Sequence, residues 1–199
     1  MKIVSWNLLH TIGATLEHVE HLIHREQPDL MLMQETTADM DRLPHRIGGH
    51  YARNPLPGRK HGLAAWSPFA FREMPRSIEL QPGLFVKRIS QVVTLEGFAV
   101  ANVHLSHSQI LNRRQLRRLG EALPRHAAII GDCNMVGPPL LPGFREAGPQ
   151  QPTHAMADMV PLRLDRCFTR GLDCLHAAVL SRIGSDHHPI TMRLMVSRS

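Results

Sequence analysis

Short apolar runs of strand length recur from one end of this 199-residue chain to the other, and they constrain its fold more than any other feature. The run at 30–33, Leu-Met-Leu-Met, has no polar alternation, which is typical of a strand buried on both faces. Between two of the runs, Glu96-Gly97 predicts a tight hairpin turn. The runs lie at residues 3–6, 30–33, 63–66, 85–95, 98–105, 127–130, 164–168 and 190–196.

Two further stretches, 14–25 and 108–123, have apolar residues at helical spacing. Strands interleaved with helices predict a layered α/β domain whose sheets are covered on both faces. The segments 48–61 and 137–153 are rich in proline and are expected to be loops, which often lie over a functional site. No domain boundary is evident, so we predict a single domain over residues 1–199.

The composition favours a globular protein with an anionic partner. Lysine and arginine total 23 against 17 acidic residues, a formal charge of +6, and nearly all of the basic residues are arginine. Arginine binds phosphate through two parallel hydrogen bonds. No apolar run approaches the ~18 residues of a membrane span. We read no signal peptide at the start, and three cysteines give no disulfide framework, so we expect a cytoplasmic protein.

Polar or acidic residues stand at the ends of most predicted strands. A layered α/β fold brings the carboxyl ends of its strands to one rim, where ligands usually bind. Carboxylates and amides gathered there offer hard oxygen ligands, which suit Mg²⁺ or Mn²⁺, and a cation would relieve the repulsion between the carboxylates. The residues concerned are Asn7, Glu35, His104, Asp132, Asn134, Asp165, Asp186 and His187.

Each of these signals alone has an ordinary structural explanation, since Gly131-Asp132-Cys133-Asn134 could be a plain turn. Their joint order is more specific: Trp-Asn, Gln-Glu, Asn-x-His-Leu, Gly-Asp-x-Asn, Arg-x-Asp, then Ser-Asp-His-x-Pro. This order resembles the endonuclease/exonuclease/phosphatase superfamily of metal-dependent phosphoesterases, over residues 6–189. The resemblance implies a four-layer α/β sandwich of two packed mixed β-sheets flanked by helices, with the active site at one rim.

The resemblance also implies roles for the polar residues. Asn7 and Glu35 resemble the metal-binding pair, with Glu35 as the direct carboxylate ligand. Asp186 resembles a metal-linked carboxylate. Asp132 and Asn134 resemble the pair that positions the attacking water and holds the scissile phosphate.

Two histidines complete the expected catalytic set. His187 resembles the imidazole that contacts the phosphate, and Asp165 resembles the carboxylate that orients this imidazole. His104 stands where the deoxyribonuclease and sphingomyelinase branches carry histidine and where exonuclease III-like repair enzymes usually carry tyrosine. This residue favours the first two branches over an abasic-site repair enzyme.

Other residues are candidates for substrate binding. Thr153, in Gln-Pro-Thr-His, resembles a phosphate-contacting threonine, although a local turn would also explain it. Arg53 and Arg59 lie in a segment that often flanks the substrate in relatives. The arginines at 113–118 fit a solvated helix face better than a nucleic-acid patch.

The sequence contains two closely spaced histidine pairs. His104-x-x-His107 and His187-His188 could suggest zinc, but their acidic and amide neighbours, and cysteines without finger spacing, disfavour it. We expect Mg²⁺ or Mn²⁺ as the cofactor.

The sequence therefore predicts a divalent-metal-dependent phosphodiester hydrolase, a nuclease acting on DNA or RNA. Two alternatives stay open: a phosphomonoesterase or lipid-headgroup or small-molecule phosphodiesterase on the same scaffold, and a catalytically silent binding module. Only 33 residues separate Asp132 from Asp165, which leaves little room for an inserted recognition arm and argues against regular duplex DNA. Endo or exo cleavage, the number of metal ions and the oligomeric state stay undetermined.

Overall fold

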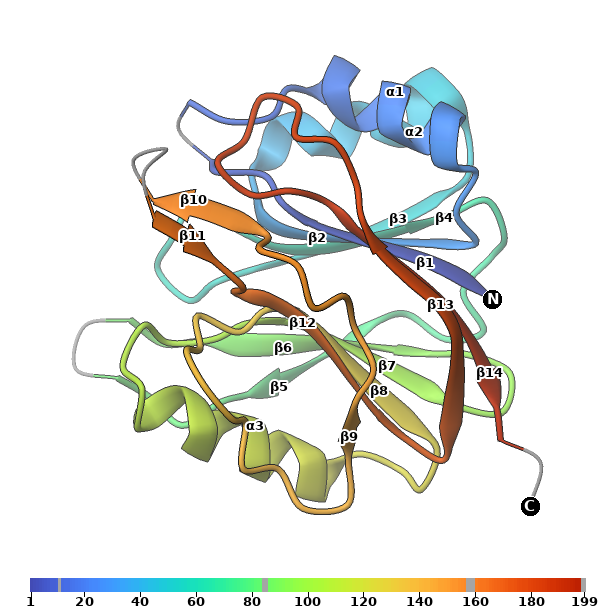
Figure 1. The fold of residues 1–199 in the computed structure, drawn as a ribbon. Helices are drawn as coiled ribbons and strands as arrows, with labels where there is room; N and C mark the ends of the chain where they lie inside the picture. The colour runs from blue at the N-terminus through green and yellow to red at the C-terminus, as the bar shows by residue number, and fades with distance from the viewer. Residues whose placement is uncertain (11, 84–85, 157–159, 198–199) are drawn as a thin grey trace.

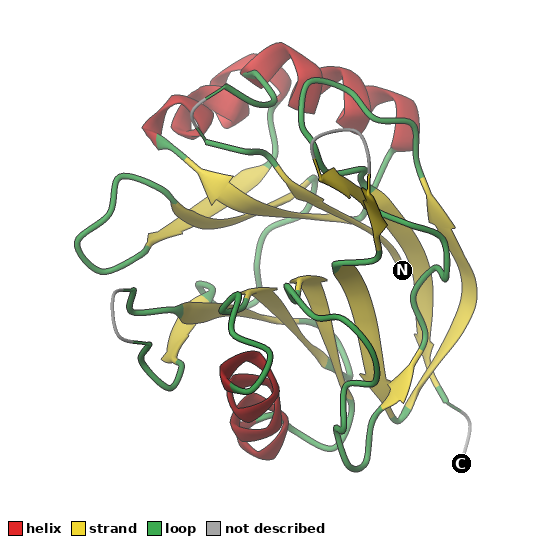
Figure 2. Cartoon of the chain, turned by 60° about the vertical axis from the view of Figure 1, so that its left-hand side comes forward, coloured by secondary structure: helices red, strands yellow, loops and turns green. Residues whose placement is uncertain are grey.

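The structure, a computed structural model, describes residues 1–10, 12–83, 86–156 and 160–197. Within these residues two six-stranded sheets pack face to face, and helices cover their outer faces (Figures 1 and 2). Each sheet is mixed, since β1 pairs with β2 in parallel and β7 pairs with β8 in parallel, while the other neighbours are antiparallel. The predicted four-layer α/β sandwich is confirmed.

The first sheet combines the two ends of the chain. Its strand order is β13-β14-β1-β2-β4-β3, so the first strand lies between the second strand and the last. The strands are β1 (Lys2–Asn7), β2 (Leu30–Thr36), β3 (His50–Pro55), β4 (Gly62–Ser67), β13 (Leu172–Val179) and β14 (Ile190–Val196).

The second sheet is built from the middle of the chain, in the order β5-β6-β7-β8-β12-β9. A separate two-stranded hairpin, β10 (His154–Met156) with β11 (Val160–Leu162), precedes β12. The strands of the sheet are β5 (Arg76–Glu79), β6 (Ile89–Thr94), β7 (Ala99–His104), β8 (Ala127–Asp132), β9 (Arg145–Glu146) and β12 (Asp165–Arg170).

Both predicted helices are present. α1 (Leu16–Glu26) starts at Thr15, whose hydroxyl accepts the His18 amide, and α3 (Leu111–Ala122) covers the second sheet. The short helices η1 (Ala38–Arg42) and α2 (Leu43–Ile47) lie beside α1 on the first sheet. No helix in the described residues is long and apolar enough to cross a membrane.

Three apolar layers hold the sandwich together, and the strands supply alternate residues to each. On β2, Leu30 and Leu32 pack between the two sheets, whereas Met31 and Met33 pack against α1 on the outer side. All four are fully buried. The unbroken apolar run at 30–33 therefore reflects burial on both faces, as predicted.

A network of buried amides joins the two sheets directly behind the rim. The Gln34 amide on β2 donates to Asn102 Oδ1 on β7 (2.7 Å). Asn102 Nδ2 contacts the carbonyl oxygens of Met33 and Ala64 in the first sheet, each at 3.1 Å. Gln91 Oε1 also accepts from Asn102 (3.1 Å). These residues flank Glu35 and His104, so the network fixes the two strands from which those side chains project.

Gly131 lies on β8 and pairs with Val103 on β7. Its φ is +138°, and an added β-carbon would lie 2.2 Å from the Val103 carbonyl oxygen. We expect Gly131→Ala to lower the free energy of unfolding by about 3 kcal/mol, which combines about 1–2 kcal/mol for positive φ with about 1–3 kcal/mol for steric overlap. Urea denaturation measures the change.

Gly58→Ala is the matched control, because Gly58 has φ +71° but no atom within 4 Å of the added carbon. Gly58→Ala should lower the free energy of unfolding only by the cost of a positive φ at alanine, about 1–2 kcal/mol. Equal losses in the two variants would show that the close contact with Val103 does not matter.

Both edges of the first sheet depart from the sequence-based expectation. The segment 48–61, expected to be a loop, contains the edge strand β3, and β13 was not predicted. Both strands are only partly buried, so their sequences lack a continuous apolar run. The predicted run 85–95 begins at a residue outside the described part of the chain, and β6 occupies 89–94 of it.

Candidate active site

The predicted polar residues meet at one rim of the sandwich. The carboxyl ends of β1, β2, β7 and β8 lie there, together with the amino ends of the antiparallel strands β12 and β14. A cavity of about 360 Å³ opens at this rim. Seven of the predicted site residues line it: Asn7, Glu35, His104, Asp132, Asn134, Asp186 and His187.

Glu35 is directed into the cavity by an irregularity in β2. The pairing with β4 shifts register between Gln34 and Thr36, and Glu35 has φ +57°. Leu9 and Asn134, which also line the cavity, have φ of +54° and +47°. Left-handed backbone in residues other than glycine is costly and concentrates at functional sites. The local strain thus coincides with the cavity.

Hydrogen bonds across the sheets bring the acidic groups together. Asn7 Nδ2, at the end of β1, donates to Asp132 Oδ2 at the end of β8 (3.0 Å). His104 Nε2 lies 3.4 Å from the same Asp132 oxygen and 3.8 Å from Glu35 Oε1. The backbone N–H of Asn134 donates to the second carboxylate oxygen, Asp132 Oδ1 (2.9 Å), so both oxygens of Asp132 are held by hydrogen bonds.

His187 is held in one orientation by a buried carboxylate. Its Nδ1 lies 2.7 Å from Asp165 Oδ2, and Asp165 is fully buried. Its carbonyl oxygen accepts from Trp6 Nε1 (3.0 Å), and its amide donates to the Ser185 hydroxyl (3.1 Å). The Nε2 atom is left on the cavity side, 3.8 Å from Asp132 Oδ2. An imidazole held in this way can exchange a proton at Nε2 only.

The two buried imidazoles differ in charge. Burial alone would lower the pKa of His187, but the charges of Asp165 and Asp132 and the Asp165 hydrogen bond raise it to about 10. Burial holds the pKa of His104 well below 6.5, and the positive charges of Arg88 and His187 lower it further. At neutral pH His187 is therefore an imidazolium and His104 a neutral imidazole.

The carboxylates are tuned by the same surroundings. Burial raises the pKa of Asp132, against the opposing effects of His187 and the Asn134 amide. Burial would also raise the pKa of Glu35, but hydrogen bonds from the side chain and amide of His10 outweigh it and lower this pKa. The His10 Nδ1 to Glu35 Oε2 distance is 2.5 Å. Glu35 is thus an anion at neutral pH.

The raised pKa of His187 predicts a pH dependence of stability. With a folded pKa of about 10 against an ordinary value of 6.5, the stabilisation is complete below pH 6.5 and is lost as pH rises through 10. We expect the difference in unfolding free energy between the native chain and His187→Gln to shrink across this window. Urea denaturation in EDTA at pH 6.5, 8 and 9.5 would test it; a constant difference would contradict the assignment.

Three residues expected to bind substrate do not line this cavity. Thr153 is fully buried, and its hydroxyl accepts the backbone amides of Leu164 and Asp165 at 3.1 and 2.9 Å. Arg53 makes a two-point ion pair with Asp41 at 2.7 and 2.9 Å. Arg59 is exposed in the turn that follows Leu56.

Three basic residues at the site were missed by sequence reasoning. His10 contacts Glu35, and His154 lines the cavity in place of its neighbour Thr153. Arg88 is 8% exposed and interacts electrostatically with Asp132 and Glu35. Its Nη1 has no hydrogen-bond partner in the described part of the chain. The only available signal was their proximity to predicted motifs, which a sequence full of histidine and arginine does not single out.

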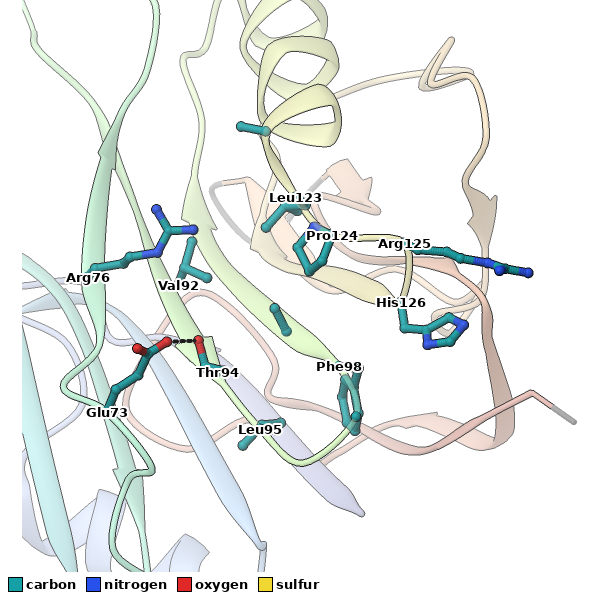
Figure 3. Close-up of a pocket in the computed structure, with 13 residues that line it drawn as sticks. Glu73, Arg76, Val92, Thr94, Leu95, Phe98, Leu123, Pro124, Arg125 and His126 are labelled. Carbon is teal, nitrogen blue, oxygen red and sulfur yellow. Dashed lines mark hydrogen bonds between the residues drawn. The ribbon is translucent and has the colours of Figure 1, made fainter.

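A larger cavity, of about 550 Å³, lies at the opposite end of the second sheet (Figure 3). It adjoins Ala99, where β7 begins, whereas His104 ends that strand at the active-site rim. Its labelled side chains include Glu73, which hydrogen-bonds Thr94, and Arg76. No cluster of acids and imidazoles comparable to the rim gathers among its lining residues, so it is not the candidate site.

A two-sheet sandwich with carboxylates, amides and an acid-supported imidazole at one rim defines a class of phosphoesterase-type proteins. Residues 4–187 match the Endonuclease/Exonuclease/phosphatase family, and the chain belongs to this family. The search of curated proteins found no match.

Solved structures share the fold at low sequence identity. An endonuclease/exonuclease/phosphatase protein from Beutenbergia cavernae has 17% identity and a TM-score of 0.75, over 98% of this chain and 71% of that one. Truncated TDP2 from Caenorhabditis elegans has 18% identity and a TM-score of 0.77, over 98% and 97%. TDP2 from D. rerio, complexed with a single-strand DNA product, has 16% identity and a TM-score of 0.77, over 98% and 99%.

Proposed function

We propose that this protein hydrolyses phosphodiester bonds in single-stranded nucleic acid, with Mg²⁺ or Mn²⁺ as its cofactor. The observation that carries the proposal is the convergence of seven acid, amide and imidazole side chains from both sheets on one cavity. Such a reaction needs an oriented water, positive charge near the phosphate and a proton for the departing oxygen.

The chain's own residues meet each requirement. Asp132, held by Asn7 and Asn134, accepts a hydrogen bond from the attacking water and orients it. His187, protonated at neutral pH and fixed by Asp165, places a charged Nε2–H toward the phosphate and donates this proton to the departing oxygen. His104, a neutral imidazole, hydrogen-bonds a phosphate oxygen or the leaving group.

The residues present fit a divalent cation. Glu35 is an anion at the cavity wall, Asp186 is a partly exposed carboxylate that lines the same cavity, and both are hard oxygen donors. Asn7 and Glu35, with Asp186, would hold the ion. When bound, it supplies a Lewis acid that neutralises phosphate charge.

Nucleic acid is the substrate class that the remaining features support. The chain carries a formal charge of +6, which attracts polyanions. A structural neighbour, TDP2 from D. rerio, is complexed with a single-strand DNA product. The three cysteines are all free thiols, consistent with a cytoplasmic, reducing compartment.

The test is a comparison of substrates with and without metal. We expect turnover of single-stranded DNA or RNA and of bis-nitrophenyl phosphate with Mg²⁺ or Mn²⁺, and none with EDTA. Turnover of nitrophenyl phosphate alone would replace the proposal with a phosphomonoesterase. Nucleic-acid binding without turnover of any substrate would identify a binding module.

A further inference from the structure

Two imidazoles and a carboxylate gather on one side of the cavity: His154, Asp186 and His187. His154 Nε2 lies 3.2 Å from Asp186 Oδ2, and the centres of the two imidazole rings are 4.5 Å apart. One donor atom from each residue lies within 4.8 Å of the other two. The three side chains are therefore close enough together to hold one metal ion.

The backbone holds these donors together. His154 and His187 form an isolated antiparallel β-bridge, and the His188 amide donates to the Thr153 carbonyl oxygen at 2.7 Å. Asp186 directly precedes His187 in the chain. The three side chains are thus presented by paired segments of backbone, so little reorganisation is needed for them to bind one ion.

His187 also has the support that metal-binding histidines require. Its Nδ1 is hydrogen-bonded to the buried Asp165 carboxylate, which leaves Nε2 facing the cavity. A carboxylate on the far ring nitrogen orients the imidazole and strengthens its donor nitrogen, and metal-binding histidines almost always have a carboxylate, carbonyl or water there.

We propose that His154, Asp186 and His187 bind a first-row transition-metal ion of the Zn²⁺ type, at a site that shares Asp186 with the proposed Mg²⁺ site but does not use Asn7 or Glu35. Two imidazole nitrogens and one carboxylate match the ligand set of open zinc sites, whereas Mg²⁺ prefers oxygen. The sequence drew attention to other histidine pairs, 104/107 and 187/188; the fold pairs His187 with His154 instead. This binding does not depend on the proposed hydrolysis.

The site has a consequence for that hydrolysis, and this part rests on the proposed function. An ion on His187 Nε2 takes the place of the proton that this nitrogen carries at neutral pH, so binding releases one proton. The ion also occupies the atom that faces the phosphate and engages Asp186. Zn²⁺ therefore inhibits the Mg²⁺-supported reaction.

Calorimetric titration of the full chain with Zn²⁺, in excess Mg²⁺, tests the site. We expect saturable binding of Zn²⁺, weakened about tenfold or more in His154→Ala. His107→Ala is the matched control, because His107 is an imidazole at the same cavity but outside the three donors, and it should bind Zn²⁺ as the native chain does. Thermal unfolding confirms that both variants are folded.

A measurement on the unaltered chain supplements the variants. Zn²⁺ should shift the imidazole nitrogen NMR signals of His154 and His187 and leave that of His107 in place. Unchanged affinity in His154→Ala, or shifts confined to other histidines, would overturn the site. Failure of the protein to hydrolyse any phosphodiester would overturn the proposed function and leave these binding results unaffected.

Discussion

Replacing His187 with alanine is expected to lower kcat for phosphodiester hydrolysis by about 10²–10⁴-fold, the range for loss of a positioned proton donor. The variant loses the only cavity-facing imidazole that a buried carboxylate holds protonated at neutral pH among the described residues. Steady-state rates on bis-nitrophenyl phosphate with Mg²⁺ measure the loss.

His176→Ala is the control for this variant, because His176 is exposed on the edge strand β13, away from the active-site rim. Its rate should match that of the native chain. Asp165→Asn should fall between the two, since the imidazole keeps a hydrogen-bond partner but loses the adjacent charge. Native rates in His187→Ala would remove His187 from the mechanism.

Asn102→Ala is expected to lower the free energy of unfolding by about 3–5 kcal/mol. The substitution leaves Gln34, Gln91 and the carbonyls of Met33 and Ala64 without their shared partner between the sheets. Each unsatisfied buried polar group costs about 1–3 kcal/mol, and partial relaxation reduces the sum. In a domain of this size the midpoint of thermal unfolding should fall by about 10 °C.

Gln151→Ala serves as the comparison, because Gln151 is an exposed amide. It should change stability by less than about 0.5 kcal/mol. A loss of under 1 kcal/mol in Asn102→Ala would mean that the amide network contributes little net stability, which is within the range seen for single hydrogen bonds.

The central strands of both sheets could be predicted from the sequence. They are buried on two faces and therefore consist of continuous apolar runs. β2 and β8 are apolar runs for this reason. The edge strands β3 and β13 were not predicted. They are only partly buried, so they contain polar residues that are also typical of loops. Pairing with a neighbour, which makes them strands, is not visible in a local window.

The candidate site divides in a similar way. Asn7, Glu35 and Asp132 could be proposed because they follow strands whose carboxyl ends share a rim. His154 could not, because it reaches the cavity through the β-bridge to His187, a contact between residues 33 positions apart. The sequence also does not show that the Thr153 hydroxyl accepts the backbone amides of Leu164 and Asp165, because this contact too forms only in the folded chain.

The interleaving of the chain's two ends in the first sheet bears on how the molecule matures on the ribosome. Of the described strands, β1 is made first and its partner β14 last, and the segment with Asp186 and His187 immediately precedes β14. The second sheet comes from one continuous stretch and can assemble earlier. A nascent chain therefore cannot pair β1 with β14, or hold Asp186 and His187 at the rim, until β14 has been made.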